Sequence, residues 1–248
     1  MKLMLLISVL VIPVTAFSAE PKLTDRERST VLLRRYVTND VEMIKLHGTN
    51  ALHVESTAWF HRSSTNLVTV LHGVKIMLID SNWTELELFQ TDSTGQSKTL
   101  QRNKARLVFS KKIGGDGIAV LELQHPFPGA YPLTISEKSP PREEPVQSIG
   151  YVVGRKLHLG KGELTYYEWG LRDGGLVPEA FGLELKNLDN TSAIDVGCSG
   201  APIIDSHGNV IAVLKIAMVV TVGDDKIRSM FVDDIPCEGI PVDVLRRW

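Results

Sequence analysis

The sequence predicts an all-β protein built from two β-rich units. Short apolar or alternating runs recur from Val41 onward, and residues that favour turns (Ser, Asn, Gly and Asp) separate them. Runs of this length and spacing are typical of strands in a barrel or sandwich rather than of helices. Six of the twelve prolines lie between Gln124 and Gln147. Because proline cannot donate a hydrogen bond to a sheet ladder, we expect this stretch to be a linker between the two units.

An apolar run from Leu3 to Ala16 follows the charged start Met1-Lys2, and the small residues Ser18 and Ala19 come after it. This order of charged, apolar and small residues is typical of a signal peptide. The run is shorter than the roughly 20 residues that a transmembrane helix needs, which disfavours a membrane anchor. We therefore expect residues 1–19 to be removed and the mature chain to be exported, either into the periplasm or out of the cell.

After the signal peptide the chain divides into four segments. Residues 20–40 are charged, and we expect them to be an N-terminal lead-in. The strand patterns on either side of the proline-rich stretch predict a first β unit at 41–124, a linker at 125–147 and a second β unit at 148–248. The second unit is expected to close with a short helix near residues 242–248.

The composition excludes several classes of partner. The formal net charge is -2 and no basic stripe is present, so nucleic acid is not an expected partner. No other stretch is long and apolar enough to cross a bilayer, so we expect no stable membrane insertion of the mature chain. We also expect no cofactor and no metal ion. The two cysteines, Cys198 and Cys237, are too few for a disulfide-rich animal domain and suit an exported bacterial protein better.

A serine stands between close glycines in Gly197-Cys198-Ser199-Gly200-Ala201-Pro202. A turn of this kind holds a hydroxyl outward and exposes backbone N–H groups, and glycine permits the positive φ that it requires. The N–H groups of Gly197 and Ser199 are candidates for an oxyanion hole. Taken alone, the motif also fits a surface Gly-Pro turn in a β protein.

A serine hydroxyl is a weak nucleophile that needs a positioned base. Among the seven histidines, only His72 directly follows a buried-type strand pattern, residues 67–71, and it precedes the turn residue Gly73. A carboxylate that orients the imidazole would complete the site. Asp116 is the candidate, since it begins a strand pattern at 117–123 and lies between His72 and Ser199 in the sequence.

In this order of His72, Asp116 and Ser199 the chain resembles the trypsin-like serine peptidases, and most closely their bacterial HtrA-type branch. The resemblance extends over about residues 50–246. The matching stretches are Thr69-Val70-Leu71-His72, residues 114–123, Ile149-Gly150-Tyr151, residues 191–202 and Ile240-Pro241-Val242-Asp243.

The resemblance implies two Greek-key β-barrels of the chymotrypsin type, with His72 and Asp116 on the first and Ser199 on the second. It also implies a serine endopeptidase that cleaves protein or peptide substrates through a triad and an acyl-enzyme. Since the sequence ends at Trp248, no PDZ domain of the HtrA kind is expected after the peptidase domain.

The aspartate departs from the family pattern. In the family it directly precedes the apolar residue of the strand, whereas here Gly117 has that place and Asp116 comes one residue earlier. A one-residue slip turns a side chain to the other face of a sheet, unless a bulge at Gly117 absorbs it. A dyad, a different acid and a catalytically inactive binding module on the same fold therefore remain open alternatives. An esterase that uses the same site is a further alternative.

The resemblance also suggests the substrate site. It puts Ala193 at the floor of the S1 pocket, and Leu214, Lys215, Ile216 and Ala217 on a wall whose backbone pairs with an extended substrate. We expect Lys215 to point away from the pocket or into solvent. A small uncharged floor predicts preference for a small or medium apolar P1 residue. A disulfide between Cys198 and Cys237 is left open, because the sequence does not give their separation.

Overall fold

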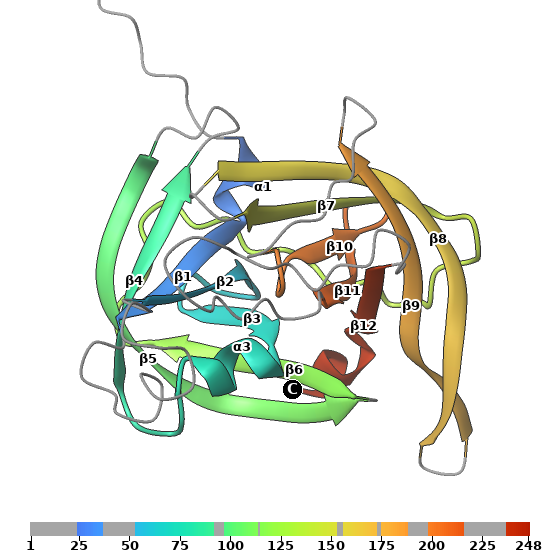
Figure 1. Cartoon of the computed structure of the whole chain (residues 1–248), viewed down its shortest axis with the longest axis horizontal. Coiled ribbons are helices and arrows are strands. Elements are labelled where there is room, and N and C mark those ends of the chain that lie inside the picture. The colour runs from blue at the N-terminus through green and yellow to red at the C-terminus, as the bar shows by residue number, and fades with distance from the viewer. Residues whose placement is uncertain are drawn as a thin grey trace, which may run out of the picture.

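The computed structural model describes residues 24–36, 53–91, 97–113, 115–152, 156–172, 175–187, 198–215 and 237–248. Within these ranges the chain forms two closed six-stranded barrels, which lie side by side in Figure 1. The predicted all-β class is therefore confirmed. The predicted signal peptide lies outside the described residues.

The first barrel has the strand order β1-β2-β3-β6-β5-β4, and every neighbouring pair is antiparallel. β1 lies within the segment that the sequence suggested as a lead-in, and it pairs with both β2 and β4. The strands are β1 (Thr30–Tyr36), β2 (His53–Phe60), β3 (Asn66–Val70), β4 (Thr84–Thr91), β5 (Ser97–Ile113) and β6 (Asp116–Leu123).

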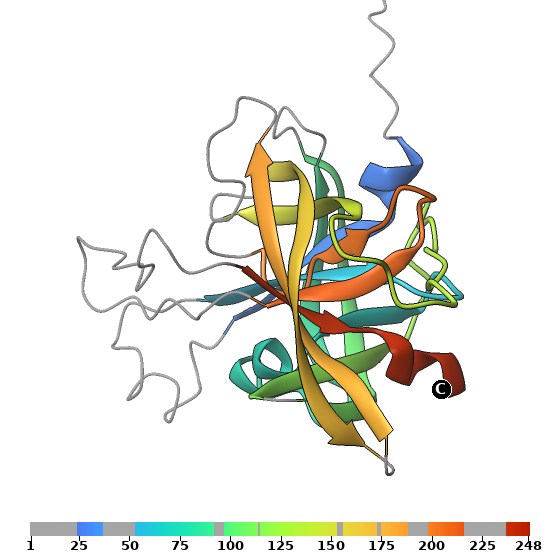
Figure 2. The ribbon, with the colours of Figure 1, turned by 90° about the vertical axis from the view of Figure 1, so that its right-hand side faces the viewer.

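The second barrel has the order β10-β11-β12-β9-β8-β7. Its strands β8 and β9 pair along most of their length and form a long two-stranded ribbon (Figure 2). The strands are β7 (Pro145–Val152), β8 (Lys156–Arg172), β9 (Gly175–Asn187), β10 (Pro202–Ile204), β11 (Val210–Lys215) and β12 (Cys237–Pro241).

Helices are short in the described part of the chain. They are α1 (Asp25–Arg28), α3 (Leu71–Ile76) and the 3-10 helix η1 (Asp243–Arg247), which is the short C-terminal helix that the sequence predicts. None of the helices in the described ranges has the length and apolar character that a membrane span requires.

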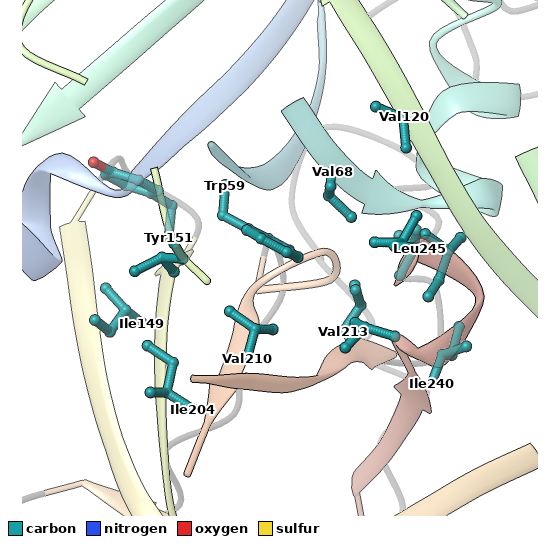
Figure 3. Packing of buried hydrophobic residues seen from close by; sticks show 14 of the residues in the cluster. Trp59, Val68, Val120, Ile149, Tyr151, Ile204, Val210, Val213, Ile240 and Leu245 are labelled. Carbon is teal, nitrogen blue, oxygen red and sulfur yellow. The ribbon is translucent and has the colours of Figure 1, made fainter. Parts of the chain in front are cut away.

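Apolar side chains gather in three clusters. One fills the first barrel and includes Phe60 and Leu121, and another fills the second barrel and includes Phe181 and Leu214. The third cluster combines residues of both barrels, with Trp59 and Val120 from the first and Tyr151 and Val213 from the second (Figure 3). Because this shared cluster is buried, the two barrels pack against each other through a continuous apolar interface.

Candidate active site

His72 lies at the start of α3, where the chain leaves β3. Val70 still has an extended backbone, and Leu71, Gly73 and Val74 then turn inward as buried residues of the helix. This pattern leaves His72 on the outer side of α3, where its side chain is 22% exposed. Val70 of β3 lies opposite Ile118 of β6, so His72 lies close to the first residue of β6.

Asp116 is that first residue of β6, and its carboxylate makes two contacts with His72. Oδ1 accepts the backbone N–H of His72 at 3.0 Å, and Oδ2 is hydrogen-bonded to the Nδ1 atom of the imidazole. The carboxylate is almost buried, with 8% of the side chain exposed. A carboxylate only accepts hydrogen bonds, so Nδ1 carries the proton and Nε2 is left as the basic nitrogen.

No bulge forms at Gly117 to absorb the offset of Asp116. The β5–β6 ladder is regular at this end, with Ile113 opposite Asp116 and Lys112 opposite Gly117, and its irregularity lies near Val108 instead. Gly117 has a different role, because a Cβ atom there would lie 2.3 Å from the carbonyl oxygen of Lys111. Asp116 reaches His72 because it is at the strand end, next to the start of α3, so the one-residue offset does not separate the two side chains.

The turn that carries Ser199 is attached to both barrels. The Ser199 carbonyl oxygen accepts the backbone N–H of Thr57 in β2 at 3.0 Å and the hydroxyl of Ser56 at 2.9 Å. On the other side, the N–H of Gly200 donates to the carbonyl oxygen of Leu214 in β11 at 2.9 Å. These bonds hold the Ser199 backbone between the first barrel and the second.

Gly200 explains the glycine that follows the serine in the motif. Its φ is +95°, and a Cβ atom there would lie 1.9 Å from the carbonyl oxygen of Thr57 and 2.4 Å from the hydroxyl oxygen of Thr69. Gly150 in β7 leaves space for the Ser199 turn on another side, since a Cβ atom at Gly150 would lie 2.9 Å from Cβ of Ala201. The turn is therefore packed too closely against both barrels for any larger residue at Gly200.

Several of the predicted substrate and oxyanion residues lie outside the described ranges, namely Ala193, Gly197, Ile216 and Ala217. Leu214 is described, and its side chain is buried in the core of the second barrel. Cys198 is also buried. The side chain of Cys237 is not among those described, so the pairing of the two cysteines stays open.

Lys215 forms an ion pair with a residue of the neighbouring strand. Its Nζ donates to Oε2 of Glu238 at 2.5 Å, and both side chains are about a third exposed, at 31% and 30%. The same Nζ lies 3.9 Å from the position that a Cβ atom on Gly115 would take. The reason is the strand register, because Glu238 of β12 lies directly opposite Lys215 in β11.

Three residues with contacts at the site were not predicted from the sequence: Ser56 and Thr57, which bind the Ser199 carbonyl, and Glu238, which binds Lys215. Ser56 and Thr57 had only one signal, a pair of hydroxyl residues in front of the apolar Ala58-Trp59. Among the described residues, no three His, Cys, Asp or Glu side chains come together as a metal site would require.

Comparison with known proteins points to one family. A sequence model of the trypsin-like peptidase domain matches residues 49–213. A search of curated protein sequences gave no match.

Solved structures share the fold at low sequence identity. Deg5 is 16% identical with a TM-score of 0.58, and the alignment covers 90% of this chain and 88% of Deg5. The active form of the Rv3671c protease from M. tuberculosis is 17% identical with a TM-score of 0.54, covering 87% and 76% of the two chains. The MamO protease domain from Magnetospirillum magneticum is 12% identical with a TM-score of 0.54, covering 90% and 96%. The family match spans more than half of the chain and agrees with its two barrels, so the chain belongs to the trypsin-like peptidase family.

Proposed function

We propose that this protein is a serine endopeptidase whose catalytic residues are Ser199, His72 and Asp116. The observation that supports this most is the double contact of Asp116 with His72, through the backbone N–H and through Nδ1. A carboxylate in that position fixes the tautomer of the imidazole and stabilises its charged form during catalysis. The attachment of the Ser199 turn to β2 and β11 adds support, since a nucleophile has to be held rigidly.

The proposed reaction proceeds through an acyl-enzyme. Oγ of Ser199 attacks the carbonyl carbon of the scissile peptide bond, and its proton passes to Nε2 of His72. The N–H groups of Gly197 and Ser199 stabilise the oxyanion that forms. When the C–N bond breaks, His72 returns the proton to the leaving amine. Water then attacks the acyl-enzyme with His72 as base, which releases the second product and restores Ser199.

The proposed substrate is a protein or peptide in extended conformation. Its main chain would pair with residues 216 and 217, beyond the end of β11, because the N–H and carbonyl groups of Leu214 already bond to Ala201 and Gly200. Its P1 side chain would enter a pocket with Ala193 at the floor. Because Ala193 is small and uncharged, the pocket favours small or medium apolar P1 residues. A peptide-library digest measures this preference, and cleavage mainly after Arg, Lys or Glu would contradict it.

We also propose that the protein acts after export. The support is the sequence of residues 1–19, with its charged start, its apolar run and its small residues at the end. N-terminal sequencing of the protein secreted or released from the periplasm tests this, and a mature chain that begins near Glu20 is the expected result.

A fluorophosphonate probe, which reacts with an activated serine, tests the catalytic assignment. We expect the mature protein to be labelled and the Ser199→Ala variant to remain unlabelled. Asp116→Asn should keep the fold but lower the labelling rate and the turnover by roughly 10⁴-fold, because an amide can donate to Nδ1 and favours the wrong tautomer.

Three results would change the proposal. Full activity of Asp116→Asn would show that another group orients His72. Hydrolysis of esters without hydrolysis of amides would indicate an esterase. A folded protein that is not labelled and cleaves neither kind of substrate would instead be a binding module on the peptidase fold.

A further inference from the structure

The hydroxyl of Ser56 lies between the segment that carries Ser199 and the segment that carries His72. Ser56 belongs to β2 and is 2% exposed. Its Oγ has three acceptors in reach: the Ser199 carbonyl oxygen at 2.9 Å, the Thr69 hydroxyl oxygen at 3.3 Å and the Thr57 carbonyl oxygen at 3.4 Å. The residues that it joins are distant in sequence, since Ser199 comes 143 residues after Ser56.

The single proton of Ser56 goes to the Ser199 carbonyl. That oxygen is the nearest of the three acceptors. The Thr57 carbonyl already accepts the Thr69 hydroxyl at 2.7 Å, so it has a closer donor. With the Thr57 N–H at 3.0 Å, the Ser199 carbonyl therefore receives two donors from the first barrel. Two donors on one carbonyl oxygen fix the plane of the peptide between Ser199 and Gly200.

The Ser56 side chain also packs against α3, the helix that carries His72. A Cβ atom on Gly73 would lie 2.8 Å from Oγ of Ser56 and 3.3 Å from its Cβ. Gly73 directly follows His72 in α3 and is itself buried. Ser56 therefore packs against the backbone next to the proposed base while it binds the backbone of the proposed nucleophile.

We propose that Ser56 is a positioning residue, whose hydroxyl sets the place of Ser199 relative to His72. This inference rests on the proposed function. Loss of the hydroxyl removes one of the two donors that β2 gives to the Ser199 carbonyl, which weakens the hold of the first barrel on the peptide that follows Ser199. A displacement of about 1 Å in a catalytic group lowers the rate by roughly 10²-fold, although the fold and the substrate pocket are intact.

The first test is Ser56→Ala, with Ser29→Ala as the matched control. Ser29 is also fully buried and also donates to a backbone carbonyl, that of Arg26 at 2.6 Å, but it caps α1. We expect Ser56→Ala to lower kcat by about 10–100-fold with KM changed by no more than about twofold, whereas Ser29→Ala keeps the kcat of the unchanged protein. Ser56→Thr retains the hydroxyl and should recover most of the lost kcat. Equal kcat values for Ser56→Ala and Ser29→Ala would overturn the proposal.

The second test is a double-mutant cycle with Gly73→Ala. The added methyl group would push the Ser56 hydroxyl away, so Gly73→Ala should lower kcat as well. In the Ser56→Ala background the hydroxyl is gone, and the closest neighbours of the methyl group are then the Cβ at residue 56, at 3.3 Å, and Cγ2 of Val70, at 3.4 Å. We expect the double variant to be no slower than Ser56→Ala alone. Losses that multiply would show that the two sites act independently and would contradict the proposal.

An additional measurement does not depend on activity. Amide hydrogen exchange of peptides that cover residues 198–205 should be faster in Ser56→Ala than in Ser29→Ala, because the carbonyl of the turn has lost a donor. Unchanged exchange in this segment would overturn the inference even if the unmodified protein were inert. An unmodified protein that resists the fluorophosphonate probe would instead contradict the proposed function, while faster exchange in this segment would still support the role of Ser56.

Discussion

Gly200 and Gly208 have nearly the same backbone conformation, with φ of +95° and +88°, but very different surroundings. A Cβ atom on Gly200 would lie 1.9 Å from the Thr57 carbonyl oxygen, and one on Gly208 would meet nothing within 4 Å. At Gly208 glycine serves the conformation alone. At Gly200 it serves both the conformation and the close contact of the Ser199 turn with the first barrel.

Replacing each glycine by alanine separates the free-energy cost of the left-handed conformation from that of the close contact. Gly208→Ala should lower the free energy of unfolding by about 1–2 kcal/mol, which is the strain of an L residue in the left-handed region. Gly200→Ala adds a clash with backbone atoms and should cost more than about 4 kcal/mol or prevent folding. Urea unfolding measures both. Equal losses at the two positions would show that the Ser199 turn is not packed against Thr57 as described.

At the residue scale, the sequence predicts those site residues that lie in a local sequence motif. Ser199 stands in a recognisable Gly-rich turn, and His72 follows a strand pattern. The offset of Asp116 suggested a reversed face, but the side chain still meets His72, because strand ends are governed by their neighbours as well as by alternation. The contacts of Ser56 with Ser199 and of Lys215 with Glu238 could not be predicted. The partners lie 143 and 23 residues apart in the sequence, and the packing of whole strands brings them together.

At the element scale, the apolar runs predict strands better than helices. α3 was expected as a turn after a strand, yet Leu71 and Val74 lie three residues apart on its buried side. A six-residue helix is too short for that spacing to stand out from the strand before it. α1 had a clearer signal, because the Thr24 hydroxyl accepts the N–H of Glu27 and the Glu27 carboxylate accepts the N–H of Thr24, which is a capping box.

A contact between elements links β7 to β4. The hydroxyl of Tyr151 accepts the N–H of Thr91 at 3.1 Å, and Tyr151 is fully buried in the cluster that both barrels share. Burial raises the pKa of Tyr151 well above its ordinary value of 10, mainly because the charged form would lose its hydration. Tyr151 therefore stays neutral in the folded protein when the unfolded chain begins to ionise.

Tyr151→Phe tests this link. We expect it to lower the free energy of unfolding by about 1–3 kcal/mol at neutral pH, because a buried donor loses its acceptor. In the unchanged protein, stability conferred by Tyr151 is full below about pH 10 and is lost as the pH rises further, since only the unfolded state releases the proton. The variant should lose this alkaline dependence. Tyr131→Phe, at an exposed position, is the control, and identical alkaline profiles for the two variants would rule the link out.

At the scale of the whole molecule, the structure contains two β-barrels, as the predicted fold class requires. Their mutual packing could not be predicted, because the interface combines strands that the linker separates, such as β2 with β7 and β3 with β11. Two residues of the proline-rich stretch also take part in this packing. Leu133 forms an isolated bridge with His61 of the first barrel, and Ile135 forms another with Val210 of the second.

His61 lies at this junction and is 3% exposed. Its Nδ1 lies 3.4 Å from the Leu133 carbonyl oxygen, and its ring packs against Trp59 and Trp248 with centroids 5.6 Å and 6.2 Å away. Burial lowers the pKa of His61 below its ordinary value of 6.5. The Leu133 carbonyl opposes this change in pKa, and the nearby charge of Arg62 adds to it. The folded protein therefore holds His61 in its neutral form.

Acidification should loosen the junction through His61. As the pH falls below about 6.5, the unfolded chain takes up a proton that the folded protein resists, so the free energy of unfolding decreases by up to about 1.4 kcal/mol per pH unit until the folded state is protonated too. Above that pH the contribution is fully present. His61→Phe keeps a ring between the two tryptophans and removes the titration, so its stability should depend less steeply on pH between 4.5 and 6.5. Urea unfolding across this range measures the slope, with His125→Gln at an exposed position as control, and a slope unchanged by His61→Phe would exclude this histidine as the source.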